Sequence, residues 1–216
     1  MKMNLPNKLT VLRLFMVPLF MIVMLIPVFT DLSSTTDSIL TLVGAFLFIA
    51  AAITDLLDGK IARREGLVTD FGKFLDPLAD KFMVIGALLC VFFSCSTSGN
   101  SMLSTVYFFA LIIVIFRELA VTSIRLIASS SKGVVIAANI LGKLKTVMQI
   151  VAISSAMIEP VLWRSLALLL PAGSLPNWFF TFPPITVVTM VAMTYLTIHS
   201  GINYIVGAWK YLDHTK

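Results

Sequence analysis

Four aspartates stand in two pairs beside apolar segments of the chain. Asp55 and Asp58 are three residues apart, and Asp76 and Asp80 are four residues apart. On a helix, both spacings place the two carboxylates of a pair on one face. A short stretch of chain joins the two segments, so we expect the two pairs to meet across a narrow gap.

Carboxylates gathered in a medium of low dielectric repel one another, so four of them require cations or protons to coexist. Oxygen ligands alone suit Mg²⁺ or Mn²⁺ better than zinc. Metals held this way can bridge a diphosphate and neutralise the charge that develops in phosphoryl transfer. The alternative is that these are ordinary carboxylates at helix ends, but acidic residues within membrane segments usually have a function.

Small residues and one arginine accompany the aspartates. Gly59 and Gly72 would let the backbone approach a ligand closely. Ala62 follows Asp58 by one helical turn, and its small side chain leaves space in the gap. Arg63 offers a planar guanidinium that suits phosphate. The stretch from 55 to 80 therefore combines metal ligands with groups that can receive a phosphorylated substrate.

The elements that carry these residues are apolar. Hydrophobic residues make up 58% of the 216 residues and charged residues only 12%, about half the charged share of soluble domains. A membrane helix needs about 20 mostly apolar residues. Six segments meet this requirement: 9–29, 39–57, 75–93, 102–128, 134–158 and 184–208. We expect one all-α domain over 1–216, with the short apolar stretch 161–170 lying along the membrane interface near Trp163, Arg164 and Trp178.

Basic residues predict the orientation in the membrane, because loops on the cytoplasmic side retain Lys and Arg. With six spans, one side holds nearly all of them: Lys2, Lys8, Arg13, Lys60, Arg63, Arg64, Lys73, Arg125, Lys132, Lys143, Lys145, Lys210 and Lys216. The other side holds Arg164 with Asp31, Asp37 and Glu159. Both termini and the 59–74 loop should therefore face the cytoplasm. The aspartates would line a polar cavity that opens to the cytoplasm, in a multi-pass protein of the inner (cytoplasmic) membrane.

A second charged group lies further along the chain. Arg117 and Glu118 fall inside the fourth apolar segment, where charges usually line a cavity. Arg125 lies eight residues beyond Arg117, on nearly the same helical face. Together with Lys143 or Lys145, they could bind the phosphate of an anionic acceptor. If helical, the two lysines point to different faces, so we expect only one to reach the pocket. Alternatively, Arg117 and Glu118 pair with each other while the remaining cations meet lipid headgroups.

The stretch 55–80 resembles the signature of the CDP-alcohol phosphatidyltransferases, Asp-x₂-Asp-Gly-x₂-Ala-Arg-x₈-Gly-x₃-Asp-x₃-Asp. Every fixed position is occupied, by Asp55, Asp58, Gly59, Ala62, Arg63, Gly72, Asp76 and Asp80. The resemblance implies a six-helix homodimer with two metal ions, Mg²⁺ or Mn²⁺, in each cytoplasm-facing cavity. It also implies that Asp80 is the general base for the acceptor hydroxyl. The CDP-lipid would bind at Asp58, Gly59, Ala62, Arg63 and Gly72.

Two further patterns resemble the glycerol-phosphate branch of that family. Residues 6–13 read Pro-Asn-x-Leu-Thr-x₂-Arg, which implies nucleotide contacts from Asn7 and Thr10; their alternative role is to cap the first helix. The Arg117-Glu118 pair, Arg125 and the Gly-Lys-x-Lys-Thr segment at 142–146 are similar to the acceptor side of the same branch. That branch transfers the phosphatidyl group of CDP-diacylglycerol to sn-glycerol 3-phosphate, giving phosphatidylglycerophosphate and CMP. We expect these substrates and membrane lipids as partners, and no nucleic acid.

Two rival hypotheses remain at this stage. The same chemistry could act on another acceptor, such as inositol phosphate, phosphatidylglycerol or serine. A divalent-cation transporter would also place acids in membrane helices. The transporter hypothesis does not explain why all four acids stand at one edge, and it has no need of Gly59, Ala62 and Arg63.

Overall fold

The computed structural model describes residues 4–65, 70–132, 140–171 and 173–209, with the backbone alone described at 5–6, 56, 58–65, 70–71, 73–74, 127–132 and 208. These ranges contain helices and no strand. The helices are α1 (Leu5–Phe29), α2 (Ser34–Glu65), α3 (Asp70–Thr97), α4 (Ser101–Lys132), α5 (Ile140–Leu169), the short α6 (Trp178–Thr181) and α7 (Pro184–Trp209). The described residues contain six helical stretches long and apolar enough to cross a membrane. The predictions of an all-α fold and of six apolar helices of membrane-spanning length are confirmed for the described residues.

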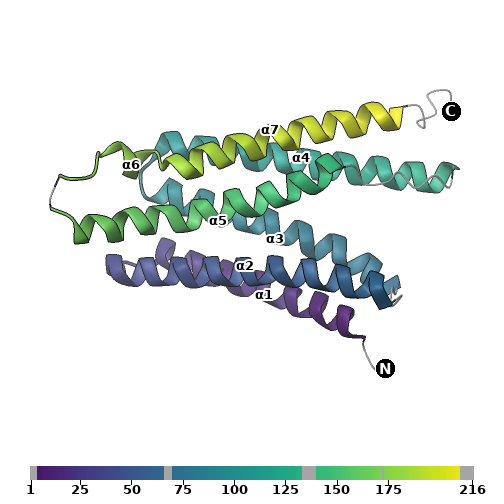
Figure 1. Cartoon of the computed structure of the whole chain (residues 1–216), viewed down its shortest axis with the longest axis horizontal. Coiled ribbons are helices and arrows are strands. Elements are labelled where there is room, and N and C mark those ends of the chain that lie inside the picture. Colours follow the sequence, from purple (N-terminus) through teal and green to yellow (C-terminus); the bar gives the residue numbers. More distant parts are fainter. Residues whose placement is uncertain (1–3, 66–69, 133–139, 172, 210–216) are drawn as a thin grey trace.

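The long helices lie side by side in an elongated bundle, and both described chain ends are at the same end of it (Figure 1). Helix α1 packs against α2 and α3, while α7 packs against α4 and α5. Contacts of α3 with α4 and of α2 with α5 join these two groups. The core contains bulky apolar side chains such as Phe20, Phe48 and Met83. Many equally apolar side chains, including Phe15, Phe46 and Phe116, are exposed, as expected for a surface that faces lipid tails.

The helices around the aspartates are longer than the sequence predicts. Residues 59–74 were expected as a loop, but α2 continues to Glu65 and α3 begins at Asp70. That expectation was wrong because polar and charged residues such as Lys60 and Arg63 end an apolar segment without ending a helix. Asp55 and Asp58 therefore share one helix, and Asp76 and Asp80 share the next.

The stretch 161–170 is another correction, since α5 continues through Pro160 to Leu169. Proline removes one helical hydrogen bond, and contacts on the following turn hold the helix together. The Trp163 indole Nε1 donates to Glu159 Oε1 over 2.9 Å, and its ring lies 4.5 Å from that of Phe179. The last turns of α5 thus form part of a long helix instead of a separate segment along the interface.

Candidate functional site

Three of the four predicted aspartates have described side chains, and the structure brings them together. Asp55 lies on α2, whereas Asp76 and Asp80 lie on α3. Asp55 interacts electrostatically with both Asp76 and Asp80. Carboxylates from the two helices are therefore close enough to influence one another's charge.

Helix α1 contacts this cluster through two side chains on one face. The Thr10 hydroxyl donates a hydrogen bond to Asp76 Oδ1 over 2.7 Å. Arg13 Nη1 pairs with Asp55 Oδ1 at 2.6 Å, and the Arg13 side chain is 0% exposed. Because Thr10 and Arg13 are three residues apart, one helical face can orient an aspartate from α2 and another from α3.

Arg13 was not among the predicted site residues. A fully buried guanidinium is costly unless it is paired, so an arginine in the first span required an acidic partner elsewhere in the chain. Arg13 also ends the Pro-Asn-x-Leu-Thr-x₂-Arg pattern. These two signals together could have placed it beside an aspartate, although the sequence does not indicate which aspartate.

Asp80 lies between the aspartates and the predicted acceptor group. The charges that act on it include Asp55 and Arg13 of the first group and Glu118 and Lys145 of the second. Its Oδ1 is buried and accepts no hydrogen bond from the described residues. A buried carboxylate oxygen without a partner is costly, and it is chemically suited to bind a cation or accept a proton.

Two members of the predicted acceptor group, Arg117 and Lys145, are joined through Glu118 in an ion-pair network. Glu118 Oε1 accepts from Lys145 Nζ and pairs with Arg117 Nη1 at 3.1 Å. Lys145 is buried, only 5% exposed, whereas Lys143 is exposed. Arg117 and Glu118 therefore pair, as the alternative hypothesis expects. Lys145 joins the same network, whereas that hypothesis places it at lipid headgroups.

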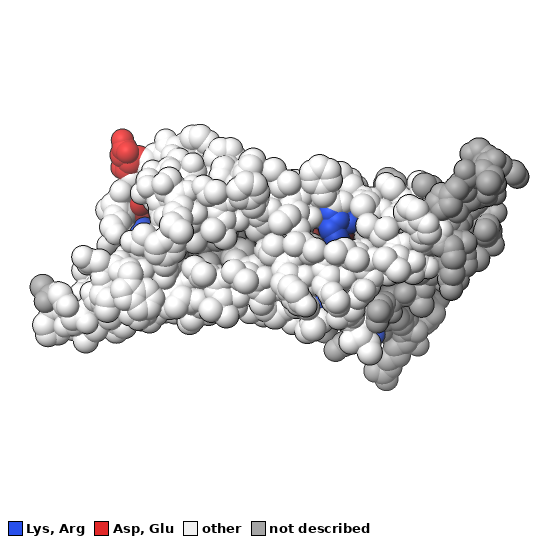
Figure 2. Space-filling view, turned by 90° about the horizontal axis from the view of Figure 1, so that it is seen from above, with Lys and Arg blue, Asp and Glu red and all other residues white. Residues whose placement is uncertain are grey.

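Helix α7 supports both predicted arginines from the side. Arg117 Nη2 lies 3.5 Å from Ser200 Oγ, and Arg125 Nε donates to the Tyr204 hydroxyl over 3.3 Å. The Arg125 guanidinium carbon also lies 5.6 Å from the centroid of the Tyr204 ring. A Cβ at Gly201 would come within 3.1 Å of Arg117 Cγ, so the glycine makes room for this arginine. On the face shown in Figure 2, Lys and Arg side chains appear in a hollow of an otherwise almost uncharged surface.

The remaining predicted residues, those expected to bind the CDP-lipid, lie on α1, α2 and α3. Asn7 is buried at the start of α1, and Gly72 is buried near the start of α3. The backbone of α2 carries Asp58, Gly59, Ala62 and Arg63, whose side-chain placement lies outside the described part. Their contacts with a CDP-lipid stay predictions, as do those of Asn7 and Thr10. In the structure, the Thr10 hydroxyl donates a hydrogen bond to Asp76.

The oxygen ligands fit Mg²⁺ or Mn²⁺, and the unpartnered Asp80 oxygen is a suitable ligand atom. Among the described side chains, no three acids lie close enough to form a metal site. Asp58, which would complete the set of four aspartates, is not among those side chains. The four-aspartate metal site therefore stays a prediction.

Comparison with known proteins finds relatives that match nearly the whole chain. Residues 3–212 match the family model described as CDP-alcohol phosphatidyltransferase. The chain is 38% identical over 213 residues to the CDP-diacylglycerol–glycerol-3-phosphate 3-phosphatidyltransferase of Bacillus subtilis (strain 168), covering 97% of each chain. It is 36% identical over 207 residues to a probable phosphatidylglycerophosphate synthase of Mycobacterium tuberculosis (strain ATCC 25618 / H37Rv), covering 96% of this chain and 82% of that protein. A Wigglesworthia glossinidia brevipalpis enzyme with the same name as the Bacillus protein is 31% identical, with 97% of each chain covered. With the aspartate signature and the six-helix bundle, these matches show that the chain belongs to the CDP-alcohol phosphatidyltransferase family.

Proposed function

We propose that the protein transfers the phosphatidyl group of CDP-diacylglycerol to sn-glycerol 3-phosphate, giving phosphatidylglycerophosphate and CMP. The position of Asp80 carries this proposal, because one carboxylate lies beside both the aspartate cluster and the Lys145–Glu118–Arg117 network. The names and coverage of the bacterial relatives support the same acceptor.

The aspartate cluster would receive the diphosphate of the CDP-lipid. Asp55, Asp58, Asp76 and Asp80 would hold two Mg²⁺ or Mn²⁺ ions, which neutralise charge on the diphosphate. Arg13 and Thr10 would keep the Asp55 and Asp76 carboxylates in place for this role. For the nucleotide end, we propose contacts from Asn7, Thr10, Gly59, Ala62, Arg63 and Gly72.

The acceptor would approach from the other side of Asp80. Lys145, Arg117 and Arg125 would bind its phosphate, since charge-assisted hydrogen bonds to phosphate are strong and directional. Asp80 would then take the proton from the primary hydroxyl. The freed oxygen attacks the phosphorus next to diacylglycerol, the bond from that phosphorus to the bridging oxygen breaks, and CMP leaves with that oxygen. Positioning and charge stabilisation account for most of the catalysis in this class of reaction.

The orientation and assembly are part of the same proposal. The C-terminal end of α2 and the start of α3, the parts of these helices that carry the aspartates, lie at the end of the bundle where both described chain ends emerge (Figure 1). Basic residues such as Lys60, Arg63 and Lys73 belong to these helix ends. By the distribution of Lys and Arg, this end would face the cytoplasm. The protein would act as a homodimer in the inner (cytoplasmic) membrane.

The test is CMP release by purified protein supplied with CDP-diacylglycerol, Mg²⁺ or Mn²⁺, and one acceptor at a time. The panel contains sn-glycerol 3-phosphate, inositol phosphate, serine and phosphatidylglycerol. We expect release with sn-glycerol 3-phosphate, loss of release with a chelator, and no release from Asp80→Asn protein. Release with another acceptor alone would agree with the proposed phosphatidyl transfer, but it would overturn the assignment of sn-glycerol 3-phosphate as the acceptor. Metal flux in vesicles without CMP release would instead support transport.

A further inference from the structure

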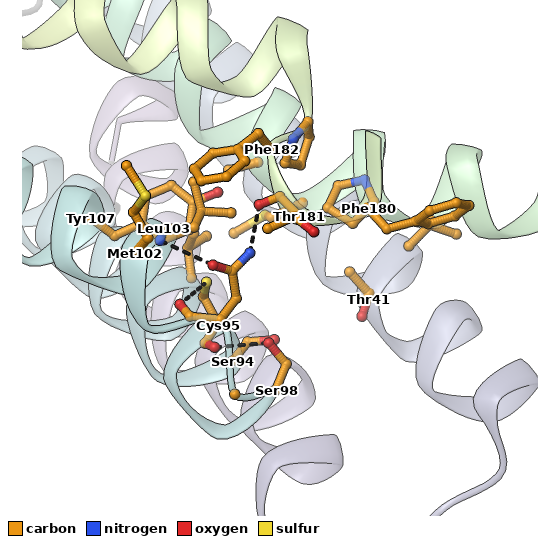
Figure 3. A pocket seen from close by; sticks show the side chains of 18 of the residues that line it. Thr41, Ser94, Cys95, Ser98, Met102, Leu103, Tyr107, Phe180, Thr181 and Phe182 are labelled. Atoms are coloured by element: carbon orange, nitrogen blue, oxygen red, sulfur yellow. Dashed lines mark hydrogen bonds between the residues drawn. The ribbon is translucent and has the colours of Figure 1, made fainter. Parts of the chain in front are cut away.

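A cavity of about 610 Å³ lies near the end of the bundle opposite the aspartates. It is formed where the end of α3, the start of α4, the later part of α5 and the segment around α6 come together (Figure 3). Arg164 on its border follows Lys145 by 19 residues of α5, a rise of about 28 Å along a helix. This is close to the thickness of a bilayer core, about 30 Å. The cavity is therefore distinct from the candidate active site.

The side chain of Asn100 connects two parts of the cavity wall. Asn100 Nδ2 donates to the carbonyl oxygen of Thr181 over 2.6 Å, and Asn100 Oδ1 accepts from Leu103 N over 3.1 Å. One side chain thus joins the start of α4 to the end of α6. Phe180 and Phe182, on either side of Thr181, also line the cavity (Figure 3).

A buried carboxylate fixes the neighbouring helix end. Glu159 accepts hydrogen bonds from Ile185 N over 3.0 Å and Thr186 N over 2.6 Å, as well as from Trp163. These are donors that the first turn of α7 would otherwise leave unpaired. Because its oxygens are occupied, Glu159 is not available as a counterion for a ligand.

Among the described residues that line the cavity, Arg164 is the only charged one. The described side chains include no ion-pair partner for it. Trp163 precedes it and contacts Phe179, which stacks on Trp178 with ring centroids 4.2 Å apart. Tryptophans of this kind concentrate at the level of lipid headgroups. Arg164 is thus expected at the depth of lipid phosphates.

The character of the lining changes with depth. Ser94, Ser98 and Arg164 supply polar groups near the helix ends, whereas Met24, Met157 and other core residues supply apolar surface further in. A free phosphate ion would gain nothing from the apolar part. A zwitterionic headgroup would find no carboxylate in the lining for its ammonium. The volume is within the range of about 300–1,000 Å³ that is usual for ligand sites.

We propose that this cavity binds an anionic phospholipid from the leaflet opposite the active site. The lipid phosphate would accept hydrogen bonds from Arg164, and the upper part of one acyl chain would lie against Met24 and Met157. The site does not take part in phosphatidyl transfer and does not depend on the acceptor used in that reaction.

The test is native mass spectrometry of the purified full-length protein, saturated with CDP-diacylglycerol so that the active site is occupied. Phosphatidylglycerol and phosphatidylcholine with identical acyl chains are titrated separately. Arg164→Gln removes the cation, and Ser94→Phe places a ring in the cavity. Lys8→Gln is the charge-matched control, because Lys8 is exposed near the start of α1, at the opposite end of the bundle.

We expect wild-type protein and Lys8→Gln to retain one phosphatidylglycerol per chain in preference to phosphatidylcholine. Arg164→Gln should weaken phosphatidylglycerol binding about fivefold, the effect of one arginine near a lipid surface, and leave phosphatidylcholine unchanged. Ser94→Phe should remove the retained lipid. Unaltered CMP release without added phosphatidylglycerol would show that the variants fold. Equal retention of both lipids, wild-type affinity in Arg164→Gln, or displacement by inorganic phosphate would each overturn the proposal.

Discussion

Thr10 of α1 donates a 2.7 Å hydrogen bond to Asp76 of α3, 66 residues further along the chain. Three residues after Thr10, Arg13 pairs with Asp55 of α2 at 2.6 Å. One face of α1 therefore connects two carboxylates that belong to different helices. The geometry of the predicted metal site depends on a helix that contributes no aspartate of its own.

Replacing Thr10 tests this connection. Thr10→Val removes the hydroxyl at nearly constant volume, whereas Thr10→Ser retains it. A hydrogen bond to a charged group contributes about 1.5–3 kcal/mol, so Thr10→Val should lower kcat/KM for CDP-diacylglycerol by about tenfold or more. Thr10→Ser should stay close to wild type. Steady-state CMP release over a range of Mn²⁺ concentrations measures this, and equal activity of the two variants would contradict it.

Arg13→Gln should destabilise the protein, because it leaves the Asp55 carboxylate without its cation in a partly buried position. Removing one partner of a buried pair costs about 3–5 kcal/mol, and the partial exposure of Asp55 should reduce this. If Asp55 binds metal, Mg²⁺ should restore more thermal stability to Arg13→Gln than it adds to wild type. Unfolding temperatures in detergent, with and without Mg²⁺, measure both effects. The control is Lys8→Gln, and identical metal-induced shifts in all three proteins would argue against the linkage.

Lys145 and Lys143 form a matched pair for the acceptor site. Lys145 is buried in contact with Glu118, whereas Lys143 is exposed two residues earlier. Lys145→Met should raise KM for sn-glycerol 3-phosphate by about tenfold or more through loss of a charge-assisted contact. Lys143→Met should change it little. Initial rates at saturating CDP-diacylglycerol separate the two variants, and a larger defect in Lys143→Met would reverse the assignment.

Asp80→Asn tests the proton acceptor. The amide keeps the size of the side chain but cannot act as a base, so kcat should fall by about 10²–10⁴, the usual contribution of general acid–base catalysis. Binding of CDP-diacylglycerol should persist, because the remaining aspartates and Arg13 are unchanged. Equilibrium binding of a labelled CDP-lipid provides that comparison. Full turnover by this variant would remove Asp80 from the mechanism.

Much of the candidate site can be predicted from the sequence, because residue spacing within one helix is a local property of the chain. The spacings of Asp55, Asp58, Asp76 and Asp80 are short, and each pair lies on one helix. The partner of Arg13 could not be predicted, since it depends on how α1 packs against α2. The choice between Lys143 and Lys145 depends on the rotation of α5 about its axis, which its contacts with neighbouring helices determine.

The continuation of α5 beyond Pro160 also required tertiary information. A proline between two apolar stretches usually marks a helix boundary. Here the hydrogen bond from Trp163 to Glu159 and the ring contact with Phe179 stabilise the next turn. Glu159 in turn bonds to the first turn of α7. None of these partners can be identified from the local pattern around Pro160.

The two groups of charged residues come from consecutive parts of the chain. Arg13, Asp55, Asp76 and Asp80 all lie within α1 to α3, whereas Arg117, Glu118, Lys145 and Ser200 lie within α4 to α7. Because chains are made from the N-terminus and their early parts fold first, a ribosome-bound chain can assemble its carboxylate cluster while the later helices are still being synthesised. The side chains that would select the acceptor then arrive last, so the growing protein could bind metal before it can use its second substrate.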